Sequence, residues 1–122
     1  MKNILIVDDN KDIRDLFKTI LESSGYQCTT ANDGKEGLDM LHANKFDLVL
    51  LDLAMPNMSG IDVLKKVKED PNLAKNKILI VTASSPADSE MIAIKKNYEV
   101  LDVIKKPINK AKLLQLIQNF RS

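Results

Sequence analysis

Four consecutive apolar residues, Leu48 to Leu51, run directly into the carboxylate of Asp52. A strand made of these residues has no polar face, so it must be covered on both sides, as the strands of parallel sheets are. Ile4–Val7 and Ile78–Val81 are equally continuous apolar runs. A chain with several such strands can fold only if layers of helix cover both faces of its sheet.

Strand-like and helix-like segments alternate along the whole chain. Strands are expected at 4–7, 26–31, 47–51, 78–81 and 100–104, from short apolar or β-branched runs. Between and after them, apolar residues recur at helical spacing, and these are Ile13, Leu16, Phe17, Ile20 and Leu21, then Leu38 and Leu41, then Ile61, Val63, Leu64 and Val67, then Met91, Ile92 and Ile94, and finally Leu113, Leu114, Leu116, Ile117 and Phe120. Strict alternation of this kind predicts an α/β fold with a doubly wound parallel sheet and right-handed crossovers.

Several residues mark where the helices begin and end. Asp9 or Asn10 can cap the first helix, and Gly25 is well placed to end it. Asn32-Asp33-Gly34 indicates a turn before a helix over 35–43. Ser59 can cap the third helix, which Asp70-Pro71-Asn72 should stop.

Length and composition exclude several classes of protein. At 122 residues the chain has the size of one domain, and we assign residues 1–122 to it. A net charge of +1 gives no field strong enough to favour nucleic acid or an anionic membrane as a partner. The single cysteine, Cys28, rules out an internal disulfide and suits a reducing compartment. The first apolar run is too short for a signal peptide, so we expect a cytoplasmic protein.

Polar residues follow the expected strands at the points where they end. Asp8 and Asp9 follow the first strand, Asp52 the third, Thr82 the fourth and Lys106 the fifth. The carboxyl ends of parallel strands share one edge of the sheet, and ligands bind at that edge. Any one of these residues alone would be read as a helix cap, a turn residue or a solvated charge. Their coincidence at one edge predicts a site.

The chemistry of this set favours a divalent cation and a phosphoryl group. Three carboxylates brought close together repel unless one is protonated or a cation lies among them. Hard oxygen ligands suit Mg²⁺, with Mn²⁺ as the alternative ion. A phosphoryl group could then contact the metal, Lys106 and the Thr82 hydroxyl. Asp52 could attack phosphorus and become an acyl phosphate.

The motifs that carry these residues resemble a known family. Val7-Asp8-Asp9, the segment from Leu51 to Gly60, Val81-Thr82-Ala83 and Lys106-Pro107 are similar, in this order, to the receiver domain of two-component response regulators. The Asn32–Gly34 turn fits as well. The resemblance covers essentially the whole chain. It implies a flavodoxin-like three-layer sandwich with five helices and a sheet of order 2-1-3-4-5.

The resemblance also implies the roles of the acidic residues. Asp52 would be the phosphoacceptor, receiving its phosphoryl group from a histidine kinase or a histidine phosphotransfer protein. Asp9 would bind Mg²⁺ directly and Asp8 largely through water. Asp52 and the backbone carbonyl of Ala54 would complete the protein ligands.

Further residues are assigned by the same resemblance. Lys106 would contact the phosphoryl group, and Thr82 would move towards it after phosphorylation. Small Ala83 would leave the approach to Asp52 open, and the bond before Pro107 would be cis. Self-dephosphorylation is expected, with Ala54 and Ser84 influencing how water reaches the acyl phosphate.

Two positions depart from the family pattern. The family usually has Tyr or Phe three residues before the lysine of Lys106-Pro107, where this chain has Val103. It also usually has Gly-Ala where this chain has Glu99-Val100. Val103 has no ring that could move between exposed and buried positions together with Thr82. The readout of phosphorylation must therefore differ from the usual one or be weaker.

We therefore expect a stand-alone, non-enzymatic receiver of the chemotaxis-regulator or phosphorelay-carrier kind. Output would pass to a protein partner at the face built from the fourth helix, fifth strand and fifth helix, with the chain a monomer or a weak phosphorylation-dependent dimer. The alternatives are a phosphorylation-independent scaffold, a receiver fragment of a longer regulator, and a phosphatase with an aspartyl-phosphate intermediate. The phosphatase ranks last, because it needs a second general acid and a cap that 122 residues do not reveal.

Overall fold

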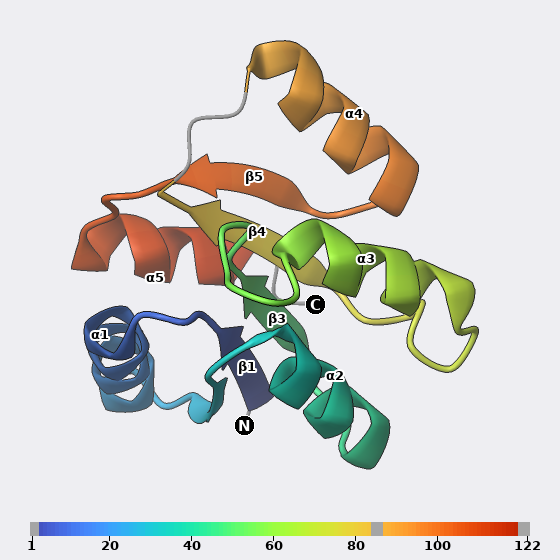
Figure 1. Cartoon of the computed structure of the whole chain (residues 1–122). Helices are drawn as coiled ribbons and strands as arrows, with labels where there is room; N and C mark the ends of the chain where they lie inside the picture. The colour runs from blue at the N-terminus through green and yellow to red at the C-terminus, as the bar shows by residue number, and fades with distance from the viewer. Residues whose placement is uncertain (1–2, 84–86, 120–122) are drawn as a thin grey trace.

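The computed structural model describes residues 3–83 and 87–119. Within these ranges, five parallel strands form one sheet in the order β2-β1-β3-β4-β5, with five helices around it (Figure 1). The strands are β1 Asn3–Val7, β2 Gln27–Ala31, β3 Leu48–Leu51, β4 Ile78–Thr82 and β5 Asp102–Lys105. The helices are α1 Lys11–Ser23, α2 Gly34–Ala43, α3 Gly60–Glu69, α4 Asp88–Tyr98 and α5 Lys110–Asn119. The doubly wound parallel fold expected from the sequence is confirmed, including the strand order.

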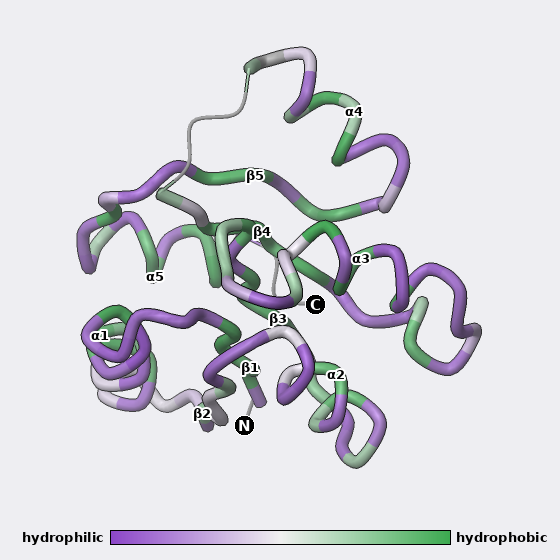
Figure 2. Tube along the Cα trace, in the orientation of Figure 1, coloured by the Kyte–Doolittle hydropathy of each residue, from purple (hydrophilic) through white to green (hydrophobic). Residues whose placement is uncertain are grey.

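The central strand β3 is buried on both faces, as its unbroken apolar run requires. It pairs with β1 on one side and β4 on the other, so that Leu51 lies beside Val7 and Ile80. Leu48 and Leu50 belong to the core beneath α1 and α5. Val49 and Leu51 belong to the core beneath α2, α3 and α4. Figure 2 shows hydrophobic residues along the strands and hydrophilic ones on the outer turns of the helices. Each buried Leu or Val contributes roughly 1.5–3 kcal/mol to folding.

Side-chain caps fix where four of the helices begin, and in α5 the Asn109 side chain accepts a hydrogen bond from the Lys112 N–H at 2.8 Å. The Asn10 side chain accepts a hydrogen bond from the Ile13 N–H, so Asn10, not Asp9, is the cap of α1. Asp33 caps α2 in the same way, and Gly34 already belongs to that helix. Ser59 caps α3 as expected, and Asp62 returns a bond to the Ser59 N–H in a capping box. α1 ends before Gly25, whose φ of 95° lies in the region that glycine tolerates best.

Some boundaries and faces differ from the expectations. β5 covers 102–105 instead of 100–104, because its pairing with β4 begins at Asp102 opposite Leu79. Val100 is buried without being part of the strand. Ile92 is 65% exposed, because it lies about 200° around the helix from Ile94, which faces the core. Leu16 is 48% exposed at the edge of the apolar stripe of α1. Phe120 lies outside the described residues.

No helix within 3–83 and 87–119 is both long enough and apolar enough to cross a membrane.

The start of α3 lies directly against the chain that leaves β3. The Gly60 N–H donates to the Leu53 carbonyl at 2.9 Å. A Cβ at Gly60 would lie 2.3 Å from the Asp52 carbonyl oxygen and 2.7 Å from the Leu53 Cα. These neighbours are backbone atoms and cannot turn aside as a side chain could. A residue larger than glycine would therefore push α3 away from the end of β3.

We predict that Gly60→Ala lowers the free energy of unfolding by about 1–3 kcal/mol, the range found for overpacked sites. Urea denaturation monitored by circular dichroism measures the change. Gly37→Ala is the matched control, because its Cβ would meet only the Val7 side chain, at 3.0 and 3.1 Å, and alanine favours the helix. Equal losses in the two variants would contradict the assigned contact with the Asp52 backbone.

Candidate functional site

The five polar residues expected at the carboxyl edge of the sheet do converge there. Asp8 and Asp9 directly follow β1, Asp52 follows β3 and Thr82 is the last residue of β4. Lys106 directly follows β5. Backbone hydrogen bonds fix the ends of these strands relative to one another, with Asp52 N–H donating to the Val7 carbonyl at 3.0 Å and Lys106 N–H to the Thr82 carbonyl at 2.8 Å.

Three carboxylates form one cluster at this edge. One oxygen each of Asp8, Asp9 and Asp52 lies within 4.8 Å of the others. Asp8 and Asp52 are only 3% and 5% exposed, whereas Asp9 is exposed to solvent. The cluster is therefore buried on the side of the sheet and open to water on the side of Asp9.

Backbone N–H groups hold two of these carboxylates in place. The Asn10 N–H donates to Asp8 Oδ1 at 2.9 Å. The Ala54 N–H donates to Asp52 Oδ1 at 3.4 Å, from the turn that follows β3. The Asp8 backbone is fixed in addition by Arg14, whose Nη1 donates to the Asp8 carbonyl at 2.8 Å.

Lys106 is the cation that faces the buried acids. Its Nζ forms an ion pair and hydrogen bond with Asp8 Oδ2, and it lies 3.9 Å from Asp52 Oδ2. The lysine side chain is only 10% exposed. A single ammonium therefore faces two buried carboxylates, and Asp9 adds a third negative charge at the rim.

Burial raises the pKa of Asp52 above its ordinary value, and the neighbouring Asp8 charge acts in the same direction. Lys106, a hydrogen bond from Thr82 and the Ala54 N–H partly oppose this rise in pKa. The charged form of Asp52 is thus disfavoured in the protein alone, and an added cation would favour it. Thr82 itself is fully buried.

The donor set fits a hard divalent cation. The clustered groups are all carboxylate oxygens, which Mg²⁺ and Mn²⁺ prefer, and the exposed side leaves room for the waters that Mg²⁺ retains. The excess of negative charge over Lys106 also favours a bound cation. Asp8, Asp9 and Asp52 could hold it. The Ala54 carbonyl stays a predicted ligand, and Ala54 is exposed on the turn beside Asp52.

The structure describes three of the positions assigned to tuning or to the cis bond, Ala83, Val103 and Pro107. Ala83 follows Thr82 and is exposed. The bond between Lys106 and Pro107 is cis. Val103 is 4% exposed and lies beside Ile80 in the sheet, so the position of the usual aromatic is filled by a core residue. Ser84 lies outside the described residues.

One structural feature of the site was not anticipated from the sequence. Arg14 reaches the Asp8 carbonyl from α1, and the only sequence signal for this contact was a basic residue in the helix that follows the acid pair.

Away from the site, Cys28 in β2 is only half-buried. Burial raises the pKa of its thiol to about 11, which leaves it protonated at neutral pH.

Comparison with known families gives one match along nearly the whole chain. The model described as the response regulator receiver domain matches residues 4–118. The polar-differentiation response regulator DivK of Brucella anthropi is 31% identical over 119 residues, which are 98% of this chain and 95% of that protein. The response regulator SaeR of Staphylococcus epidermidis is 38% identical over 98% of this chain, but the chain spans only 50% of SaeR.

Solved structures give the same match. The chemotaxis protein CheY4 of Vibrio cholerae superposes with a TM-score of 0.88 at 29% identity, and 98% of each chain is covered. The response regulator TrrA of Thermotoga maritima, solved in complex with Mg²⁺-BeF, gives a TM-score of 0.84 at 32% identity, covering 98% of this chain and 99% of TrrA.

We predict that Asp52→Asn raises the free energy of unfolding of the metal-free protein at about pH 7. Because the pKa of Asp52 is raised on folding, the stability contributed by its protonated form is complete below the unfolded pKa of about 3.9 and is lost as pH rises through the folded pKa. Asparagine is neutral at every pH. The gain in the free energy of unfolding should therefore shrink as pH falls through the folded pKa of Asp52 towards its unfolded pKa. Urea denaturation in a chelator at about pH 7, 5 and 4 measures it.

Asp39→Asn, at an exposed position on α2, is the control for loss of one negative charge. An Asp52→Asn variant that is less stable than the native protein at pH 7 would contradict the assigned cost of burying the Asp52 charge.

Proposed function

Because the chain belongs to the response regulator receiver domain family, we propose that residues 1–122 act as a phosphorylation-controlled receiver with Asp52 as phosphoacceptor. The donor would be a phosphohistidine of a histidine kinase or of a histidine phosphotransfer protein. The observation that carries the proposal is the burial of Asp52 at the end of β3, with Asp8, Asp9 and Lys106 gathered around it.

The transfer is a displacement at phosphorus. An Asp52 carboxylate oxygen forms a bond to phosphorus while the bond from phosphorus to the donor imidazole nitrogen breaks. The electron pair of the broken bond stays on that imidazole nitrogen, and Asp52 becomes an acyl phosphate. No oxidant or second substrate is needed.

Each residue of the cluster has a defined part in this transfer. The rigid end of β3 and the Ala54 N–H hold Asp52 in position for attack. Lys106, already 3.9 Å from Asp52, would neutralise negative charge on the phosphoryl oxygens. Thr82 would donate its hydroxyl to one of them.

Asp9, Asp8, Asp52 and the Ala54 carbonyl would hold Mg²⁺ or Mn²⁺. The bound ion would supply positive charge to the phosphoryl oxygens. The related TrrA was solved in complex with Mg²⁺-BeF, which supports this assignment for the present chain.

The protein would not act as an enzyme on other molecules. It would phosphorylate itself from the donor and then lose the phosphoryl group by attack of water on the acyl phosphate. Ala54 and Ala83 are small and exposed beside the site, so they leave water a path to Asp52. Ser84 is the third residue proposed to tune this rate.

Output would pass through protein contacts at the surface of α4, β5 and α5, without direct contact to nucleic acid or membrane. We propose a monomer or a weak phosphorylation-dependent dimer. The proposed compartment is the cytoplasm, where Cys28 would stay reduced. The burial of Val103 also supports a second candidate, a scaffold whose contacts do not depend on phosphorylation.

Incubation with acetyl phosphate and Mg²⁺ should add one phosphoryl group to the native protein, as measured by intact mass. Asp52→Asn should add none, because it lacks the nucleophilic oxygen. Lys106→Met should lower the rate of addition at least about tenfold, since loss of one charge-stabilising group typically costs about 10²–10³ in rate. Equal addition in the native protein and Asp52→Asn would refute Asp52 as the acceptor.

A beryllofluoride mimic with Mg²⁺ should shift the backbone amide resonances of α4 and β5 as well as those around Asp52. Such a spread follows if Thr82 and the adjoining segment move without help from an aromatic residue at 103. Thr82→Ala is the comparison variant, and it should confine the changes to the neighbourhood of Asp52. If the resonance changes of the native protein are also confined to the neighbourhood of Asp52, switching is excluded. A passive phosphoryl carrier or the scaffold is then favoured.

A further inference from the structure

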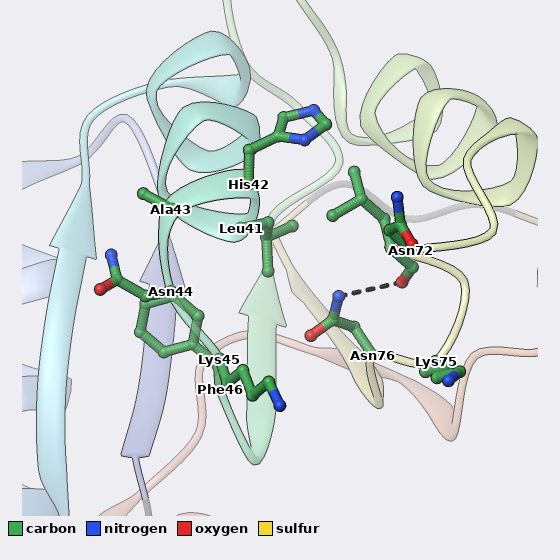
Figure 3. A pocket seen from close by; sticks show the side chains of 10 residues that line it. Leu41, His42, Ala43, Asn44, Lys45, Phe46, Asn72, Lys75 and Asn76 are labelled. Carbon is green, nitrogen blue, oxygen red and sulfur yellow. Dashed lines mark hydrogen bonds between the residues drawn. The ribbon is translucent and has the colours of Figure 1, made fainter.

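A hollow lies at the end of the molecule away from Asp52. It is formed by the last turn of α2, the segment 44–46 that leads into β3, and the turn 72–76 that leads into β4 (Figure 3). Its volume is about 580 Å³, within the range of ligand pockets. Both connecting segments precede their strands, so the hollow is at the amino edge of the sheet and Asp52 is at the carboxyl edge. We call it the amino-edge groove.

The floor of the groove is apolar. Leu41 and Leu73 are almost fully buried there, and the Phe46 ring is half-buried. Figure 3 shows Leu41 pointing into the hollow between α2 and the 72–76 turn. Because the two leucines expose almost no surface, an apolar side chain of a ligand would rest chiefly on the exposed part of Phe46.

Asparagine side chains line both sides of the groove. Asn44 lies on one side, with its amide turned away from the 72–76 turn in Figure 3, and Asn72 and Asn76 stand on the other side. The turn that carries the last two is held by its own hydrogen bonds, from Asn76 Nδ2 to the Leu73 carbonyl at 2.9 Å and from the Asn72 N–H to Asp70 Oδ1 at 2.9 Å. Amide groups donate and accept hydrogen bonds, so they match the backbone of an extended peptide.

The charged residues that line the groove are basic. Lys45 and Lys75 come from its two opposite walls, and neither forms an ion pair with another described residue. His42 also lines the groove, but the Asp70 carboxylate lies 3.9 Å from its Nδ1 and faces it. One exposed lysine thus stands on each side of the apolar floor. This arrangement is complementary to a ligand in which carboxylates flank an apolar side chain.

We propose that the amino-edge groove docks an acidic segment of a partner protein. One apolar side chain of that segment lies against Phe46, above the buried Leu41 and Leu73, and flanking carboxylates pair with Lys45 and Lys75. The groove and the phosphoacceptor are at opposite edges of the sheet. A partner held here leaves Asp52 accessible and stays bound whether or not Asp52 is phosphorylated.

The probe is the peptide acetyl-Glu-Glu-Leu-Glu-Glu-amide, titrated into the full chain and followed by backbone amide resonances. Shifts should concentrate at residues 41–46 and 72–76, and binding should weaken as salt is raised, because the pairing charges are exposed. Replacing the four glutamates by glutamine, or the leucine by glycine, should weaken binding at least about fivefold. Equal binding of the glutamine peptide, or shifts centred on the carboxyl edge, would overturn the proposal.

Variants of the protein separate the groove from general attraction to a basic surface. Lys45→Glu and Lys75→Glu should each weaken binding about three- to tenfold, as expected for reversing an exposed charge pair. Lys110→Glu makes the same change at an exposed position of α5, outside the groove, and should leave the affinity for the peptide unchanged. Asp52→Asn should also bind as the native chain does, so the result is independent of phosphoryl transfer. Equal losses in Lys45→Glu and Lys110→Glu would refute a specific groove.

Discussion

The ammonium of Lys106 is the charge on which the carboxyl edge of the sheet depends. It pairs with Asp8 and faces Asp52, two carboxylates that are almost fully buried. A buried charge without a partner typically destabilises a protein by about 3–5 kcal/mol. The lysine comes from the end of the last strand and the acids from the ends of the first and third. The site is therefore complete only when the whole sheet has assembled.

The position of this cluster could be predicted from the sequence because it follows from topology. Leu48 to Leu51 require a strand that is covered on both sides, and a parallel sheet is the usual structure that provides this. Once the strands are parallel, residues that follow them share one edge whatever their rotamers. Asp52 and Lys106 thus meet although more than fifty residues separate them. No detail of side-chain packing was needed for that inference.

Other features could not be predicted because they depend on packing between segments that are distant in sequence. The glycine at position 60 reads as a common helix-start residue, and only the structure reveals the Asp52 carbonyl against it. Val100 is β-branched, as strand residues often are, yet it is buried in the core outside the pairing of β5 with β4. The amino-edge groove joins two polar segments, around Lys45 and Lys75, neither of which is informative alone.

At the surface proposed for output, Val103 limits how a signal could be read out. Val103 lies in the same buried core as Ile94 of α4, and it has no ring to reorient. α4 has no side-chain cap at its start, whereas Lys68 of α3 donates to the Asn97 carbonyl at 2.7 Å near its end and lies 5.7 Å from the Tyr98 ring centroid. Any signal from Asp52 at this surface would therefore have to use contacts other than a ring flip, because position 103 has no ring in this chain.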